Sequence, residues 1–128
     1  MRLRRYLNRI YDTLRIRQEI RIVSLRVEEI EPNQEGLVEA RLQFWDGSQL
    51  YIDEVLLAQG SLLVKTPYAY HYQDAQSNLI FRYDDAPHHP HLSTHPHHKH
   101  TPQGVVEANP PDIADVLKEI DELLYGAS

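Results

Sequence analysis

Residues 37–57 read LVEARLQFWDGSQLYIDEVLL and carry the clearest structural signal in the chain. From Val38 to Phe44 apolar residues occupy every second position, which is the period of a strand with one buried face. Asp46-Gly47 then forms a strong two-residue turn signal, because both residues tolerate the backbone of a tight hairpin turn. Another alternating segment follows the turn. The stretch therefore predicts an antiparallel β-hairpin.

The same two-residue period continues on both sides of this hairpin. Ile20 and Ile22 alternate on one parity and Leu25 and Val27 on the other, so we expect a β-bulge near residues 23–24. Short polar turns separate the segments. We therefore expect an antiparallel meander of about five strands across residues 19–84, with its later strands at 50–57, 62–73 and 79–83.

Two residues inside these strands depart from the pattern. Pro67 lacks a backbone N–H, so it indicates either an edge strand or a bend. Glu54 interrupts an apolar run, and a carboxylate that faces inward must be either paired or functional.

Helical periodicity marks the two ends of the chain. Residues 3–14 place their apolar side chains on one stripe, and a second stripe begins at Ile113. Asn109 to Asp112, with two prolines between them, reads as a helix start. The sequence predicts one α+β domain over residues 1–128, with its parts at 1–17 (helix), 19–84 (sheet), 85–111 (His/Pro-rich loop) and 112–125 (helix).

Composition narrows the class of protein. The 128 residues include no cysteine, which excludes disulfides, thiolate metal sites and a cysteine nucleophile, and fits the reducing cytoplasm. No apolar run approaches the roughly 20 residues that span a bilayer, so we expect no membrane association. The formal charge of −6 argues against a bulk polyanion binder.

Charge is divided between the two ends of the chain. Eight arginines and four acidic residues lie within residues 1–30, whereas one lysine and six acidic residues lie within 103–128. One interpretation is that two solvated helix faces of opposite sign pair at the surface. The other is that the basic face binds RNA or an acidic partner.

Residues 85–111 carry the unusual chemistry. They contain six of the eight prolines and seven of the eight histidines, and apolar periodicity is lost there. A long irregular segment in a compact domain is usually functional or disordered. We therefore treat this loop as the candidate site.

General acid–base catalysis is the first hypothesis for this loop. Imidazole titrates near neutral pH, so one histidine can take a proton while another gives one, as metal-independent RNA cleavage requires. We expect the acid and the base to be one residue from His88 and His89 and one residue from the later histidines, because adjacent histidines point apart. The candidate acids and bases are His88, His89, His97, His98 and His100.

Neighbouring side chains supply candidate substrate contacts. Arg82 and Lys99 can hold phosphate, the first with two parallel hydrogen bonds and the second as a point charge. Tyr70 and His71 line the same region if the strand register permits, and a one-residue slip reverses their faces. Asp84, at a strand end, either belongs to the site or bonds to Arg82 or a loop N–H.

Two other functions remain open from these residues. Neutral imidazoles bind divalent transition metals, although the spacing matches no zinc signature and adjacent histidines in an extended chain point apart. We therefore expect no cofactor, with a metal at the histidines as the lesser hypothesis. The remaining alternative is a non-enzymatic module that docks a protein partner.

Three segments together resemble the TumE family of small prokaryotic toxins. They are residues 68–74 (YAYHYQD), 79–90 (LIFRYDDAPHHP) and 96–100 (PHHKH). The resemblance implies the toxin component of a toxin–antitoxin pair, located in the cytoplasm. It also implies a cognate antitoxin protein, encoded nearby and often carrying a DNA-binding domain. From the histidine chemistry, and not from the resemblance, RNA is the expected substrate, and the chain is also a candidate for homo-oligomer formation.

Overall fold

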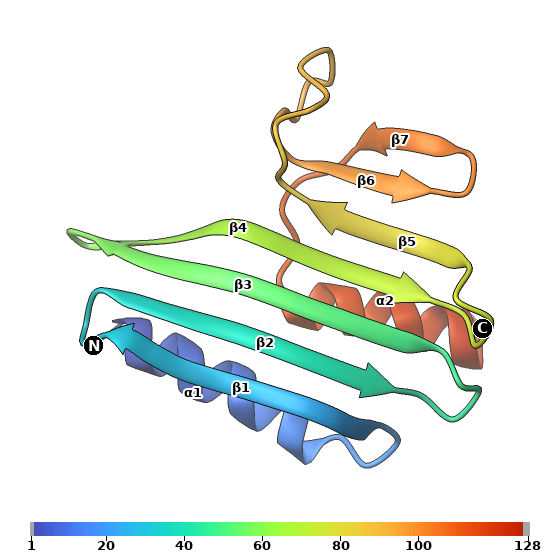
Figure 1. Ribbon diagram of the computed structural model, residues 1–128, viewed down its shortest axis with the longest axis horizontal. Helices are drawn as coiled ribbons and strands as arrows, with labels where there is room; N and C mark the ends of the chain where they lie inside the picture. The colour runs from blue at the N-terminus through green and yellow to red at the C-terminus, as the bar shows by residue number, and fades with distance from the viewer. Residues whose placement is uncertain (1, 127–128) are drawn as a thin grey trace.

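A single seven-stranded antiparallel sheet organises the molecule, and its strand order β1-β2-β3-β4-β5-β6-β7 follows the chain (Figure 1). The structure is a computed structural model and describes residues 2–126. Its elements are α1 (Arg2–Ile16), β1 (Arg21–Glu31), β2 (Glu35–Gln43), β3 (Gln49–Gln59), β4 (Leu62–Gln73), β5 (Leu79–Asp84), β6 (His98–Thr101), β7 (Gly104–Glu107) and α2 (Ile113–Tyr125).

Both helices lie on the same face of the sheet, as Figure 1 shows. The predicted apolar stripe of α1 is buried at Leu3, Leu7, Ile10 and Leu14, and that of α2 is buried in the same way. Inward side chains of β2 to β5 complete the core, which burial of apolar surface stabilises. The α+β prediction is confirmed, and within residues 2–126 no helix covers the opposite face of the sheet.

The meander is longer than the sequence predicts. About five strands are expected and seven are present, because residues 85–111 contain the hairpin of β6 and β7. Strand β5 offers the backbone groups of its free edge, and β6 pairs with them at Arg82↔His100, Tyr83↔Lys99 and Asp84↔His98. These backbone bonds need no apolar alternation, which is why periodicity does not reveal the two strands.

Two irregularities in the sheet fall where the sequence indicates them. The pairing of β1 with β2 shifts register between Ile22 and Ser24, so the predicted bulge is confirmed. The pairing of β3 with β4 shifts opposite Val55, and the extra residue lies in the Thr66-Pro67 segment. Strand β4 pairs with β5 only from Ala69 onward, so Pro67 lies at the bulge and in a part of β4 whose other side is a local edge; both predicted roles apply.

The oppositely charged ends of the chain contact each other. Arg9 of α1 donates two hydrogen bonds to Asp112, at 2.8 and 3.0 Å, and Arg17 donates one to Asp121 at 2.6 Å. The first interpretation of the charge pattern, surface pairing, therefore describes these two arginines. Within residues 2–126 no helix has the length and apolar composition needed to cross a membrane.

Candidate functional site

The face of the sheet without helices presents two parallel rows of polar side chains. Residues directly opposite each other on paired strands share a face, so the register identifies each row. We call the first the basic row; it consists of Arg41, Tyr51, His71, Arg82 and His100, one residue from each strand from β2 to β6. We call the second the acidic row; it consists of Glu39, Asp53, Ala69, Asp84 and His98 on the same strands.

Side chains of the basic row stack against one another. The guanidinium of Arg41 lies 5.0 Å from the ring centroid of Tyr51, and Tyr51 meets His71 edge to face at 5.9 Å between centroids. Arg82 reaches into the acidic row, where its Nε donates to Asp84 Oδ2 at 2.9 Å. The rows therefore join at Arg82 and Asp84.

A histidine cluster closes the end of both rows. We use this name for His89, His98 and His100 with Asp84. His98 Nε2 lies 3.0 Å from His100 Nε2 and 2.9 Å from Asp84 Oδ1, and His100 Nε2 lies 3.3 Å from Asp84 Oδ2. His89 comes from the loop, and its ring centroid is 4.9 Å from that of His98. One nitrogen from each of the three rings falls within 4.8 Å of the others.

Local structure holds each member of the cluster in place. Asp84 ends β5, and its Oδ1 accepts the backbone N–H of Ala86 at 3.0 Å. His98 begins β6 directly opposite Asp84 and is 2% exposed. Its Nδ1 lies 2.8 Å from the carbonyl oxygen of Pro96. Because the period of a strand is two, His100 lies on the same face as His98.

The electrostatics of the cluster favour neutral His89 and His100 rings and a charged Asp84 carboxylate. Burial lowers the pKa of His100, and the rings of His98 and His89 lower it further against the opposing charge of Asp84. Desolvation also lowers the pKa of His89. Burial tends to raise the pKa of Asp84, but the Ala86 N–H and the Arg82 guanidinium outweigh it, so this pKa is lowered.

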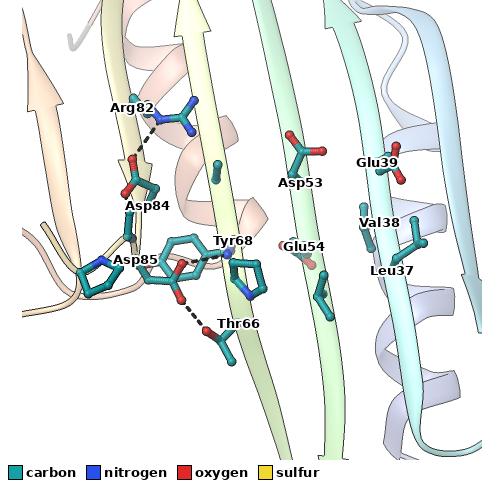
Figure 2. A pocket seen from close by; sticks show the side chains of 15 residues that line it. Leu37, Val38, Glu39, Asp53, Glu54, Thr66, Tyr68, Arg82, Asp84 and Asp85 are labelled. Carbon is teal, nitrogen blue, oxygen red and sulfur yellow. Dashed lines mark hydrogen bonds and ion pairs between the residues drawn. The ribbon is translucent and has the colours of Figure 1, made fainter. Parts of the chain in front are cut away.

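A groove of about 640 Å³ runs from the cluster along the acidic row. Figure 2 shows Arg82 and Asp84 on one side of it, Asp53 and Glu39 on the other, and the sheet lying between this groove and the helices. Leu37, Val55 and Ala69 are among its apolar lining residues. The groove therefore shares Asp84 with the cluster and is also lined by Arg82, which donates to Asp84.

Asp85 shapes the wall of this groove without joining the cluster. Its Oδ1 accepts the backbone N–H of Tyr68 at 3.0 Å, and its Oδ2 accepts the hydroxyl of Thr66 at 2.7 Å (Figure 2). These bonds continue the contact between β4 and the chain after β5 beyond the last paired residues, Ala69 and Asp84, and they hold the start of the loop against β4.

The structure separates the ten residues singled out in the sequence. His89, His98, His100, Arg82 and Asp84 come together on the open face, and His71 lies beside Arg82 in the basic row. The expected pairing of a first-pair histidine with one of the later group is present in space, and its catalytic role stays a prediction. The remaining four residues are placed elsewhere: His88, His97, Lys99 and Tyr70.

Each of these four has a local reason for its position. His88 is exposed in the loop, and His97 bonds through Nδ1 to the Tyr68 hydroxyl at 2.9 Å. Lys99 points to the helix-covered face and binds Glu119 of α2 at 2.7 Å. Tyr70 is fully buried on that same face. Adjacent strand residues face opposite ways, so Tyr70 and His71 cannot line one region.

Several residues of the open face were not singled out from the sequence. Arg41, Tyr51 and Asp53 each extend a row, yet each resembles an ordinary solvent-facing residue of an alternating strand. The predicted two-residue turn at Asp46-Gly47 is wrong by one residue: Phe44 and Ser48 close a three-residue loop. This loop sets Arg41 opposite Tyr51, whereas a two-residue turn would set it opposite Ile52 and give the rows other members.

Comparison with known proteins agrees with this sequence and fold. No curated protein and no solved structure gives a significant match to the chain. The protein family described as "Toxin TumE" matches residues 9–124, which is most of the chain and includes the basic row, the acidic row and the whole histidine cluster. The chain therefore belongs to the TumE toxin family.

Proposed function

We propose that this protein is the toxin of a type II toxin–antitoxin pair and that it cleaves RNA at the histidine cluster. The observation that carries the proposal is the meeting of His89, His98, His100 and Asp84 with Arg82 at the end of the basic row. Membership of a toxin family supports the biological role. The reaction is inferred from the chemistry of these side chains.

The basic row suits a single-stranded RNA. Its five positions lie on adjacent strands about 4.8 Å apart, so it extends for about 19 Å across the sheet. Tyr51 and His71 offer rings on which unpaired bases can stack, and Arg41 and Arg82 offer guanidinium groups for phosphate. The parallel acidic row repels phosphate, which favours one path for the RNA backbone.

The reaction that fits these groups is attack of a ribose 2′-hydroxyl on the adjacent phosphorus. The 2′-oxygen loses its proton, the bond to the 5′-oxygen breaks, and that oxygen gains a proton. Arg82, whose side chain is 40% exposed, can hold the phosphate as its charge rises. The cluster supplies the remaining chemistry, through its imidazoles as acid and base or through a cation that they hold.

A protein antitoxin would neutralise this toxin by covering the open face. That face holds the groove and the cluster and has no helix over it, whereas α1 and α2 cover the other face (Figure 1). A segment laid along the groove would cover the acidic row from Glu39 to Asp84 and would contact Arg82 at the site. We expect the protein encoded beside this chain to copurify with it and to restore growth.

The test compares growth and RNA cleavage for three single variants. His100→Ala should lower the rate of cleavage by about 10²–10⁴-fold, the usual share of an acid or base. Arg82→Ala should lower it by about 10- to 100-fold through loss of a charged hydrogen bond. His95→Ala is the matched control, since this exposed loop histidine lies outside the cluster.

Two outcomes would contradict the proposal. If His100→Ala and Arg82→Ala cleave RNA and arrest growth as the wild type does, the cluster is not the active site. If the wild type arrests growth but cleaves no RNA under any condition, the non-enzymatic binding module becomes the better description.

A further inference from the structure

In the histidine cluster one nitrogen from each of three rings lies within 4.8 Å of the others, and the Asp84 carboxylate contacts two of these rings. The carbonyl oxygen of Pro96 can only accept a hydrogen bond, so His98 Nδ1 carries a proton. In the neutral ring, His98 Nε2 is then an unprotonated acceptor. It lies 2.9 Å from Asp84 Oδ1 and 3.0 Å from His100 Nε2. A cation at their centre would satisfy all three groups.

The spacing of the donor atoms is that of a metal coordination shell. Zinc binds imidazole nitrogen at about 2.0–2.1 Å, so two ligands at tetrahedral positions lie about 3.3–3.4 Å apart. His98 Nε2 lies 2.9 Å from Asp84 Oδ1 and 3.0 Å from His100 Nε2, and His100 Nε2 lies 3.3 Å from Asp84 Oδ2, so these contacts are equal to or slightly shorter than ligand separations around zinc. His89 is partly exposed, and one of its ring nitrogens lies within 4.8 Å of a ring nitrogen of His98 and of His100, which places it as the fourth ligand.

The groups behind these ligands are already oriented. His98 donates its other ring N–H to a backbone carbonyl, an arrangement usual for metal-ligating histidines. Asp84 accepts from the Ala86 N–H through Oδ1 and from Arg82 Nε through Oδ2. Ligating carboxylates are typically held by such bonds, which fix their direction before the ion arrives.

We propose that His89, His98, His100 and Asp84 bind one divalent transition-metal ion, with Zn²⁺ as the ion that fits best. Three imidazoles and one carboxylate without any thiolate suit Zn²⁺, whereas Mg²⁺ and Ca²⁺ prefer shells made of oxygen. The ion would also supply positive charge at the end of the acidic row. The inference stands apart from the proposed function, because metal binding is measured without RNA.

The experiment is a titration of the metal-stripped 128-residue chain with ZnCl₂, in which isothermal calorimetry measures the heat of binding. We expect one Zn²⁺ per chain in the wild type. His100→Ala should weaken this binding by more than about 100-fold, and Asp84→Asn by about 10- to 100-fold. His95→Ala is the matched control, because it removes one loop histidine and leaves the cluster intact; its affinity should equal that of the wild type.

The nature of the site is checked by Co²⁺ in place of Zn²⁺. Visible absorption typical of four-coordinate Co²⁺ should appear in the wild type and in His95→Ala, and not in His100→Ala. Circular dichroism establishes that His100→Ala is folded, and His89→Ala offers a second, partly exposed ligand if it is not. Absence of stoichiometric binding, or equal weakening in His95→Ala and His100→Ala, would overturn the inference, the latter by showing adventitious capture on a histidine-rich loop.

RNA cleavage then separates the two proposals. Cleavage lost in chelator and restored by Zn²⁺ supports both. Cleavage that persists in chelator supports the metal-independent reaction predicted from the sequence and assigns the imidazoles themselves as acid and base. Metal binding without cleavage contradicts the proposed function and leaves the metal site established.

Discussion

Glu54 faces the helix-covered core with 2% of its surface exposed. It accepts hydrogen bonds from the hydroxyl of Tyr6 at 2.6 Å and from the hydroxyl of Tyr70. Lys65 Nζ lies 3.8 Å from its Oε2 and donates to the hydroxyl of Tyr70 and to the carbonyl of Pro111. An inward-facing carboxylate is expected to be either paired or functional, and these contacts show that Glu54 is paired.

Removing the cation from this network should destabilise the fold strongly. Lys65→Met leaves the charge of Glu54 buried without its counter-ion, so we expect the free energy of unfolding to fall by about 3–5 kcal/mol. Urea denaturation measures the change. The double variant Glu54→Gln/Lys65→Met should recover part of the loss because no uncompensated charge remains. Lys118→Met on the exposed face of α2 is the control and should shift stability by less than about 0.5 kcal/mol. If Lys65→Met and Lys118→Met destabilise the fold equally, Lys65 is not the counter-ion of Glu54.

At the scale of elements, α2 is anchored at its first turn. Asp112 caps the helix by accepting the N–H of Ala114, and Asp115 reaches back to the N–H of Asp112. Arg9 of α1 meets the same carboxylate with two hydrogen bonds. The hydrogen bond from Arg9 is the main cause of the lowered pKa of Asp112, and the N–H of Ala114 adds to it.

This cap should make part of the stability depend on pH. The pKa of Asp112 is lower in the folded chain than in the unfolded chain, so its contribution is present above about pH 4 and is lost as the pH falls through the folded value. Asp112→Asn keeps a capping oxygen but loses the ion pair, and should cost about 1 kcal/mol or less at pH 7. Its deficit should shrink toward pH 3 in thermal melts. Asp12→Asn removes an exposed carboxylate of α1 as the control; a pH-independent deficit in Asp112→Asn would exclude the linkage.

At the scale of the whole molecule, the two faces of the sheet have different roles. The helices seal one face with an apolar core, and the other face holds the rows, the groove and the cluster. Basic side chains occur on both sides, since Arg5 is exposed on α1 whereas Arg41 lies in the basic row. The proposed function requires RNA to use the second set.

RNA affinity should therefore depend on the face and not on the number of arginines. We expect Arg41→Ala to weaken binding of a short single-stranded RNA and to reduce the slope of log affinity against log salt by about 0.7, the value for one phosphate contact on a single strand. Arg5→Ala removes the same charge from the helix-covered side and should leave both quantities unchanged. Fluorescence anisotropy at several salt concentrations measures them. The reverse result would favour the basic face of α1, the other interpretation of the charge pattern.

The sequence by itself determined the two helices, strands β1 to β5 and their order along the chain. Period-two and period-3.6 patterns, the Asp46-Gly47 turn and the helix start before Ile113 are local signals, because side-chain direction follows the local backbone. They are sufficient to predict a meander with a helix at each end. They also located the segment that holds the histidine cluster, since loss of periodicity and an accumulation of histidine are visible without coordinates.

Only the tertiary structure decided which side chains meet. Strands β6 and β7 form because the edge of β5 supplies backbone partners, and that pairing places His98 opposite Asp84. The same register sends Lys99 to the covered face and separates Tyr70 from His71. Strand pairing is a contact between distant segments, and a shift of one residue exchanges the faces, so composition and periodicity alone cannot specify it.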